Sequence, residues 1–271
     1  MKASQRIQIL AEKVRKENPL VHNITNYVTV NDCANAVLAV GGSPIMADDE
    51  KEAADITAIS SALVLNIGTL NQRTIPSMIL SGKKANELGI PVVFDPVGAG
   101  ASAFRNETAK KILQEVKISV IRGNLSELSF LAGLGSSTKG VDSSAEDEEK
   151  EAAAVAEKAS KIYQCTVCIT GKMDVVTDGT RIAYGKNGNS MMAKVTGTGC
   201  MATAVTGAFC SVTDNCYDAA LAAITVMGIA GERAYEEAGN RGTGSFHIEL
   251  INALSTMSRM QIEERTEIEE F

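Results

Sequence analysis

Short, mostly apolar runs that end in glycine or polar residues alternate with helix-like segments along this chain. The clearest run is residues 62–67, which Gly68-Thr69 closes, and residues 165–170 form another. A strand without regular polar alternation is buried on both faces, which is typical of a parallel sheet covered by helices. The pattern therefore predicts an α/β fold with a doubly wound, mostly parallel central sheet.

A hairpin signal predicts an antiparallel edge to this sheet. Residues 174–177 and 181–184 are strand-like and are joined across Asp178-Gly179, a strong turn signal. Residues 191–195 are expected to extend the same edge as a further strand. The sheet should therefore be parallel in its first part and antiparallel at its end.

No linker and no internal repeat divides this series, so the 271 residues are expected to form one domain. The polar, Gly/Ser/Thr-rich stretch 135–144 is the best candidate for a mobile loop. A last helix is expected over residues 246–264, and residues 263–271 are expected to be an acidic, frayed tail.

The composition argues against several classes of function. The formal net charge is −7 and Lys and Arg form no basic patch, which argues against a nucleic-acid partner. No apolar run approaches the roughly 20 residues of a membrane span, and the first residues lack the apolar core of a signal peptide, so we expect a cytoplasmic protein. The six scattered cysteines are expected to be reduced thiols, and two histidines exclude a histidine-rich metal site.

A glycine-rich turn, Gly197-Thr198-Gly199-Cys200, leads directly into an apolar helix of small residues. The two glycines allow backbone conformations in which successive N–H groups converge on one oxyanion. The helix adds its unpaired N-terminal donors and the positive end of its dipole. The same residues also suit a tight turn before a buried helix, and the motif alone does not decide between the two.

Two further predicted strand ends carry acidic residues. Asp95 lies in the segment 91–100, where a buried strand meets a glycine-rich loop, and a desolvated carboxylate there needs donors or a cation. Its alternative role is to form the turn before Pro96. Asn124 and Glu127 form a capping-box pattern at a predicted helix start, and the same geometry would aim Glu127 at a cation beyond the strand ends.

A polar loop, residues 22–27, follows the first predicted strand. Strand-to-helix loops of this kind bind small ligands in α/β folds. Its side chains would serve equally well to cap and turn the chain. The loop is therefore a candidate for substrate binding with a structural alternative.

Three motifs in this order carry a resemblance to a known family. They are Asp95-Pro96-Val97-Gly98-Ala99-Gly100, Asn124-Leu125-Ser126-Glu127 and Gly197-Thr198-Gly199-Cys200. With them the chain resembles the ribokinase-like kinases, and most closely the hydroxyethylthiazole kinases of thiamine salvage. The similarity runs from about Asn18 to near Gly239, and it implies a three-layer α/β/α architecture.

The resemblance implies ATP-dependent phosphorylation of the primary alcohol of 4-methyl-5-(2-hydroxyethyl)thiazole, with Mg²⁺, in a homotrimer whose substrate sites lie at subunit interfaces. It also assigns roles to particular residues. Asn26, Met46 and Gly197 match substrate-binding positions, Arg122, Thr170 and Asn124 match the nucleotide site, Asp95 and Glu127 match the metal-linked acids, and Gly197, Thr198, Gly199 and Cys200 match the catalytic turn.

Cys200 lies where most ribokinase-like enzymes have an aspartate base. The helix start is expected to favour its thiolate, so Cys200 either accepts the alcohol proton or only orients the hydroxyl group. The alternative enzymes are a kinase for hydroxymethylpyrimidine or a sugar, or the related nicotinamide-nucleotide hydrate dehydratase, and the cysteine argues against all three. A catalytically silent nucleotide-binding protein is a further alternative, but it would not need Asp95, Glu127 and Arg122 together.

Overall fold

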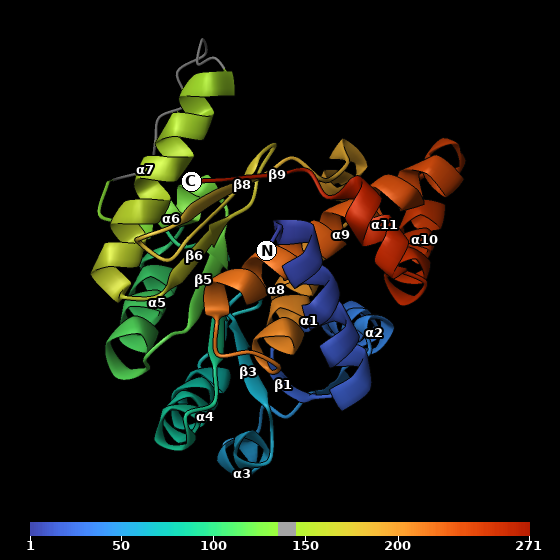
Figure 1. Cartoon of the computed structure of the whole chain (residues 1–271). Coiled ribbons are helices and arrows are strands. Elements are labelled where there is room, and N and C mark those ends of the chain that lie inside the picture. Colours follow the sequence, from blue (N-terminus) through green and yellow to red (C-terminus); the bar gives the residue numbers. More distant parts are fainter. Residues whose placement is uncertain (135–144) are drawn as a thin grey trace.

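The computed structural model describes residues 1–134 and 145–271, and the loop expected at 135–144 lies outside them. Over the described residues, nine strands form one sheet in the order β2-β1-β3-β4-β5-β6-β7-β8-β9 (Figure 1). Neighbouring strands are parallel from β2 to β6 and antiparallel from β6 to β9, which confirms the predicted mostly parallel sheet with an antiparallel edge. The strands are β1 (Leu20–Ile24), β2 (Ser43–Ile45), β3 (Ala62–Asn66), β4 (Val92–Asp95), β5 (Val120–Gly123), β6 (Thr166–Ile169), β7 (Asp174–Thr177), β8 (Ile182–Gly185) and β9 (Ile268–Glu270).

Helices cover both faces of the sheet, with α4, α5 and α7 on the opposite side from α1, α8 and α9 (Figure 1). The first face carries α1 (Ala3–Glu17), α2 (Val30–Val40), α8 (Thr198–Cys210), α9 (Cys216–Ala238), α10 (Thr243–Ser255) and α11 (Arg259–Arg265). The second face carries α3 (Ala53–Ala58), α4 (Thr74–Leu88), α5 (Ala103–Glu115), α6 (Leu125–Leu131) and α7 (Ala145–Tyr163). Two short 3-10 helices are η1 (Ser190–Lys194) and η2 (Gly239–Arg241). Among the helices of residues 1–134 and 145–271, none is long and apolar enough to cross a membrane.

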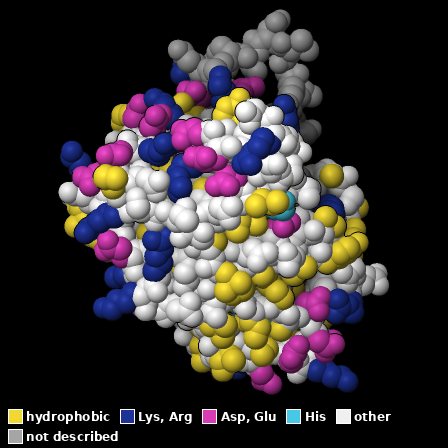
Figure 2. Space-filling view, turned by 90° about the vertical axis from the view of Figure 1, so that its right-hand side faces the viewer, with side chains coloured by type: hydrophobic (Ala, Val, Ile, Leu, Met, Phe, Trp, Pro, Cys, Tyr) yellow, Lys and Arg dark blue, Asp and Glu magenta, His cyan; other side chains and the backbone are white. Residues whose placement is uncertain are grey.

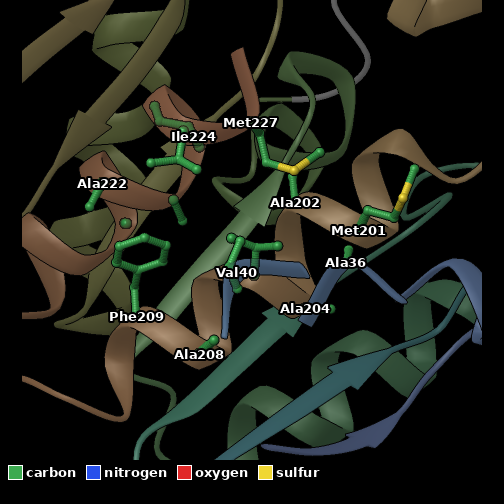
Figure 3. Packing of buried hydrophobic residues seen from close by; sticks show 14 of the residues in the cluster. Ala36, Val40, Met201, Ala202, Ala204, Ala208, Phe209, Ala222, Ile224 and Met227 are labelled. Atoms are coloured by element: carbon green, nitrogen blue, oxygen red, sulfur yellow. The ribbon is translucent and has the colours of Figure 1, made fainter. Parts of the chain in front are cut away.

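Two buried clusters, one on each face, hold the layers together. Successive residues of a strand point to opposite faces, so on β3 Val64 joins the α8 cluster while Leu63 and Leu65 join the α4 cluster. Figure 3 shows the first cluster, in which side chains of α8 pack against those of α2 and α9. Every residue of α8 from Cys200 to Cys210 is buried, so this helix is fixed on all sides.

Small residues let α8 lie close against the sheet. A Cβ atom on Gly207 would lie 2.6 Å from Cγ2 of Val64, so a larger residue there would push α8 away from β3. One turn earlier, the hydroxyl group of Thr203 donates a hydrogen bond to Asp95 at the end of β4 (2.7 Å). The start of α8 therefore lies at the carboxyl ends of the parallel strands.

Two sequence-based assignments near the C-terminal half are wrong. Residues 191–195 do not form a strand, because Asn189 caps the 3-10 helix η1 by accepting a hydrogen bond from the N–H of Met191 (2.9 Å). The single helix expected over residues 246–264 is two helices, because Ser258 caps a separate helix, α11.

The acidic C-terminal segment is paired, which corrects the frayed tail expected at residues 263–271. Strand β9 pairs with β8 and completes the antiparallel edge. Glu269 forms an ion pair with Lys186 (2.6 Å), and Glu270 forms one with Arg6. The acidic residues that suggested solvation are therefore matched by basic side chains of β8's end and of α1.

Candidate active site

The carboxyl ends of β3, β4 and β5 bring polar side chains together beside the start of α8. Asn66 ends β3 and lies opposite Asp95, the last residue of β4, in the parallel register. Arg122 lies one residue before the end of β5. The residues before Asn66 and Asp95 in their strands are apolar and buried, so polar side chains begin only where these strands leave the core. This edge is where open α/β sheets bind ligands.

Asp95 is a buried carboxylate, 1% exposed, with one oxygen engaged and one free. Its Oδ2 accepts hydrogen bonds from Nδ2 of Asn66 (2.9 Å) and from the hydroxyl group of Thr203 (2.7 Å). Nη1 of Arg122 lies 3.8 Å from the same oxygen. Burial raises the pKa of Asp95 to about 6, although the Arg122 charge acts in the opposite direction. Its Oδ1 is buried and has no hydrogen-bond partner among the described residues.

Arg122 has hydrogen-bonding capacity to spare. Its Nη2 donates a hydrogen bond to the hydroxyl group of Thr170, which directly follows β6. The buried Nε has no partner in the part of the chain that the structure describes. A Cβ atom on Gly199 would lie only 2.7 Å from Nη1 of Arg122. Glycine at this position thus lets the guanidinium group lie directly beside the first turn of α8.

The glycine-rich turn forms the start of α8. Gly197 adopts a left-handed conformation with φ of 90° and precedes the helix, where a Cβ atom would lie 2.6 Å from Cγ2 of Thr29. Met201 donates to the carbonyl oxygen of Gly197 (2.7 Å), so the N–H groups of the three residues between them precede the first intrahelical bond. Thr198 itself holds the turn, because its hydroxyl group donates to the carbonyl oxygen of Met192 (3.0 Å).

Cys200 faces the same group of side chains. Its Sγ accepts a hydrogen bond from Nδ2 of Asn66 (3.3 Å), and Nδ2 of Asn26 lies 3.9 Å away. Burial raises the pKa of the Cys200 thiol, and the charge of Asp95 adds to this effect. The sequence-based expectation that the helix start favours the thiolate is therefore wrong, because burial outweighs the stabilising contacts.

Glu127 and Asn124 form the predicted capping box at the start of α6. The Asn124 side chain accepts a hydrogen bond from the N–H of Glu127 (3.0 Å), and Oε2 of Glu127 accepts one from the N–H of Asn124 (2.9 Å). Oε1 of Glu127 accepts a further bond from the N–H of Gly98 (2.8 Å), so this carboxylate also ties down the loop after β4. The charge of Glu127 raises the pKa of Asp95, which indicates that the two acids lie near each other.

The described residues contain no group of three or more His, Cys, Asp and Glu side chains that would hold a metal ion on its own. The donors available to a divalent cation are the free Oδ1 of Asp95 and the carboxylate of Glu127. Mg²⁺ is bound through one or two carboxylates together with water and substrate phosphates, so this small donor set fits a cation that arrives with a nucleotide.

A cavity of about 510 Å³ opens beside the guanidinium group of Arg122 and the first turn of α8. Its size is that of a small-molecule site. Asp174 on β7 lies in its wall, and burial raises the pKa of this carboxyl group to about 7. The polar side chains in the lining are Arg122, Thr170, Lys172, Asp174, Lys186, Asn187, Asn189, Ser190 and Thr198.

Of the two predicted substrate-binding residues Asn26 and Met46, only Asn26 lies beside Cys200. Asn26 lies after β1 and reaches Cys200, and a Cβ atom on Gly68 would lie 2.5 Å from its Nδ2. Met46 follows β2, two positions from β3 in the sheet, and packs partly buried against the α8 cluster. Asn26 thus belongs to the central group of side chains, whereas Met46 lies farther along the edge of the sheet.

An apolar surface lies next to the loop that carries Asn26. Tyr27 and Val28, just before α2, are 72% and 58% exposed, and Ile248 on α10 is 65% exposed. Helices α2 and α10 pack together on the side of Figure 1 that Figure 2 turns toward the viewer, and there hydrophobic side chains gather in broad patches.

Sequence reasoning missed three polar residues of this site, Asn66, Thr203 and Asp174. Asn66 had a visible signal, because it is the polar residue near the end of an otherwise apolar run. Thr203 is one turn after Gly199 in α8, and only the packing of α8 against β4 reveals its contact with Asp95. Asp174 was assigned to the hairpin, where an acidic residue gives no separate signal.

The mostly parallel sheet, its antiparallel edge and the helices on both faces form a ribokinase-like fold. A pyridoxal kinase from Staphylococcus aureus, solved in complex with AMP-PCP, shares the fold with a TM-score of 0.59 at 18% sequence identity, over 79% of this chain and 88% of that chain. At this identity the likeness concerns the fold alone.

Similarity to hydroxyethylthiazole kinases is much greater. The model of the hydroxyethylthiazole kinase family matches residues 11–260. A hydroxyethylthiazole kinase of Clostridium beijerinckii is 60% identical over 270 residues, which are 98% of each chain. The structure of a hydroxyethylthiazole kinase protein from Pyrococcus horikoshii OT3 has a TM-score of 0.91 and 40% identity, over 98% of this chain and 99% of that chain. The chain therefore belongs to the hydroxyethylthiazole kinase family, as its resemblance predicted.

Proposed function

We propose that the protein transfers the γ-phosphoryl group of ATP to the primary alcohol of 4-methyl-5-(2-hydroxyethyl)thiazole, and so supplies thiazole phosphate to thiamine biosynthesis by salvage. The alcohol oxygen forms a bond to the γ-phosphorus, the bond to the β–γ bridging oxygen breaks, and the alcohol loses its proton. Family membership supports the reaction. The observation that carries it is the buried carboxylate of Asp95, which has a free oxygen and lies beside Arg122, a residue in the wall of a cavity of about 510 Å³.

The cavity beside Arg122 is the proposed nucleotide site. Arg122 has an unpartnered Nε within the described part of the chain and would pair with phosphate oxygens, while Thr170 holds its guanidinium group in place. Asn124, which directly follows β5 and caps α6, is also proposed to contact the nucleotide. Such fixed donors lower the barrier because they are aligned before the charge develops.

The N–H groups at the start of α8 would meet the charge of the transferred group. Gly197, Thr198 and Gly199 form the turn, and Cys200 completes the first helical turn. Phosphoryl transfer depends mainly on alignment and charge neutralisation. A backbone cradle that close packing fixes in place meets this requirement without a strong base.

Asp95 and Glu127 are the proposed residues for the divalent cation, and the proposed ion is Mg²⁺. When bound there, Mg²⁺ would supply positive charge that neutralises the phosphate groups. The free Oδ1 of Asp95 supports this assignment, because a buried carboxylate oxygen without a partner is costly unless a ligand uses it.

The thiol of Cys200 is proposed to orient the alcohol rather than to remove its proton as a thiolate. Burial raises the pKa of Cys200, so the neutral thiol prevails near neutral pH. Asn26, Met46 and Gly197 are proposed to contact the thiazole. Asn26 and Gly197 both lie beside Cys200 or its turn, which supports their part of the assignment.

We further propose a homotrimer with substrate sites at its interfaces, one kinase domain over the whole of the 271 residues, and a cytoplasmic location. The exposed apolar side chains of Tyr27, Val28 and Ile248 support an interface next to the substrate loop. The single sheet, whose strands come from Leu20 to Glu270, supports one domain. Six cysteines that form no disulfide suit a reducing compartment.

An ADP-release assay tests the reaction. The protein is incubated with Mg-ATP and, in separate reactions, hydroxyethylthiazole, hydroxymethylpyrimidine or ribose. We expect clear stimulation by the thiazole alone, and stimulation only by another alcohol would overturn the assignment. Gel filtration checks the assembly, because a monomer at assay concentration would contradict the proposed interface sites.

A further inference from the structure

The side chain of Asn66 lies between two central groups of the site, Asp95 and Cys200. It is 2% exposed, and its Nδ2 lies 2.9 Å from Oδ2 of Asp95 and 3.3 Å from Sγ of Cys200. Its Oδ1 accepts a hydrogen bond from the N–H of Gly68 (2.8 Å). Every polar atom of this buried amide therefore has a partner.

The backbone of Gly68 determines which way the amide faces. A backbone N–H only donates, so the amide atom next to it is the oxygen, and the reversed amide would set two buried donors against each other. A Cβ atom on Gly68 would lie 2.9 Å from Oδ1 of Asn66 and 2.5 Å from Nδ2 of Asn26, so glycine is needed for this close contact. The NH2 group of Asn66 consequently faces Asp95 and Cys200, with one hydrogen for each.

This orientation decides what the two groups can offer a substrate. At Asp95, Asn66 and Thr203 both donate to Oδ2, and Oδ1 stays free. At Cys200, the sulfur accepts a hydrogen from Asn66, so the thiol's own hydrogen points away from the amide. One side chain thus leaves an acceptor free on the acid, and it leaves the thiol hydrogen for a group other than the amide.

We propose that Asn66 is a positioning residue, which sets the free oxygen of Asp95 and the thiol hydrogen of Cys200 toward the site at the same time. The inference rests on the proposed function, and it adds a physical link between Asp95 and Cys200. Asn66 touches neither the alcohol nor the nucleotide in this role. It also separates two groups that would repel each other if both were ionised.

Kinetics of an isosteric variant test this role. Asn66→Asp keeps the shape and the acceptor for Gly68 but cannot donate to both partners. We expect kcat to fall roughly 10- to 100-fold, with KM for ATP and for the alcohol nearly unchanged. In a Cys200→Ala background the same substitution should lower kcat by a smaller factor, because part of its effect acts through the thiol. Normal kcat in Asn66→Asp, or equal losses in both backgrounds, would overturn the proposal.

The reactivity of Cys200 gives a second test that needs no turnover. Alkylation by iodoacetamide at one fixed pH, followed on the Cys200 peptide by mass spectrometry, should be about 3- to 10-fold slower in Asn66→Asp. Unchanged alkylation would show that Asn66 does not act on the thiol. Because neither ATP nor the alcohol is present, this result stands even if the protein proves not to phosphorylate the thiazole.

Asn71→Asp is the matched control. Asn71 also accepts hydrogen bonds from backbone N–H groups, those of Arg73 (3.1 Å) and Thr74 (3.2 Å), and its Nδ2 donates to the carbonyl oxygen of Thr69 (3.3 Å). None of these hydrogen bonds reaches Asp95 or Cys200. It should keep the wild-type kcat and alkylation rate. Equal effects of the two substitutions would mean that any asparagine-to-aspartate change near β3 disturbs the site, which contradicts the proposal.

Discussion

Two edges of the same sheet treat charged side chains in opposite ways. At the carboxyl ends of β3 to β5, the Asp95 side chain is 1% exposed and surrounded by donors that come from three different elements. At the antiparallel edge, Lys186 and Glu269 form an ion pair whose side chains are 46% and 57% exposed. Both are short-range polar contacts, but only the first lies inside the core.

The comparison separates polar side chains that contribute to the stability of the fold from those that form a functional site. An exposed ion pair adds little stability because water solvates both partners. A buried carboxylate costs stability, and its retention indicates a use other than holding the fold together. The following substitutions test this contrast, from the largest expected effect to the smallest.

Replacing Asp95 by asparagine should have the largest effect. The change removes the negative charge but keeps the size of the side chain, so kcat should fall by roughly 100- to 1,000-fold. Steady-state kinetics with Mg-ATP and hydroxyethylthiazole measure it, and circular dichroism verifies that the variant folds. Near-normal turnover of the Asp95→Asn variant would show that the buried carboxylate has no catalytic use, contrary to this prediction.

The same substitution should stabilise the fold at high pH. The folded-state pKa of Asp95 is raised from 3.8 to about 6, so its protonated form favours the folded state. That contribution is complete below about pH 4 and is lost as pH rises through 6. Asp95→Asn should therefore raise the free energy of unfolding at pH 8 by about 1–3 kcal/mol, with a smaller gain at pH 4.5. Urea unfolding at both pH values measures this, and a variant less stable at pH 8 contradicts it.

Gly199→Ala should act mainly on nucleotide binding. The new Cβ atom would lie 2.7 Å from Nη1 of Arg122, so the guanidinium group must move away from Thr170. We expect KM for ATP to rise about tenfold, the loss of one hydrogen bond to a charged group. Gly244→Ala is the control, because nothing lies within 4 Å of its Cβ position, and it should leave KM unchanged. Equal KM values in the two variants would refute the role of the close contact.

Glu269→Gln should have the smallest effect. Both side chains of the ion pair with Lys186 are exposed, so the free energy of unfolding should hardly change. Urea unfolding in low and high salt measures the change, which salt should reduce further. If Glu269→Gln changed the free energy of unfolding as much as Asp95→Asn does, exposure would not explain the difference between the two edges.

The fold was predictable to the extent that local patterns determined it. The apolar run at 62–67 and the turn at Asp178-Gly179 correspond to β3 and to the β7–β8 hairpin. Residues 191–195 were assigned wrongly because a local capping contact was overlooked, and residues 263–271 because a tertiary contact decides them. A capping asparagine bends the first into η1, and a free strand edge recruits the second as β9.

The candidate site was predictable in its motifs but not in its contacts. The three glycine-rich or acidic motifs lie at one edge of the sheet, as parallel strands require. The thiol state of Cys200 was predicted wrongly, because the extent of its burial depends on α2, α8 and β3 together. The approach of Gly199 to Arg122 and the bridging amide of Asn66 join segments far apart in the sequence, and nothing local reveals them.

Strand β9 also affects whether copies of the protein aggregate. An uncovered strand edge offers unpaired backbone groups to a neighbouring chain, and β8 would be such an edge without β9. The strand that covers it is only three residues long and carries Glu269 and Glu270, and a short strand with charged side chains is a poor template for further pairing. Deleting residues 268–271 would therefore favour aggregation through open strand pairing.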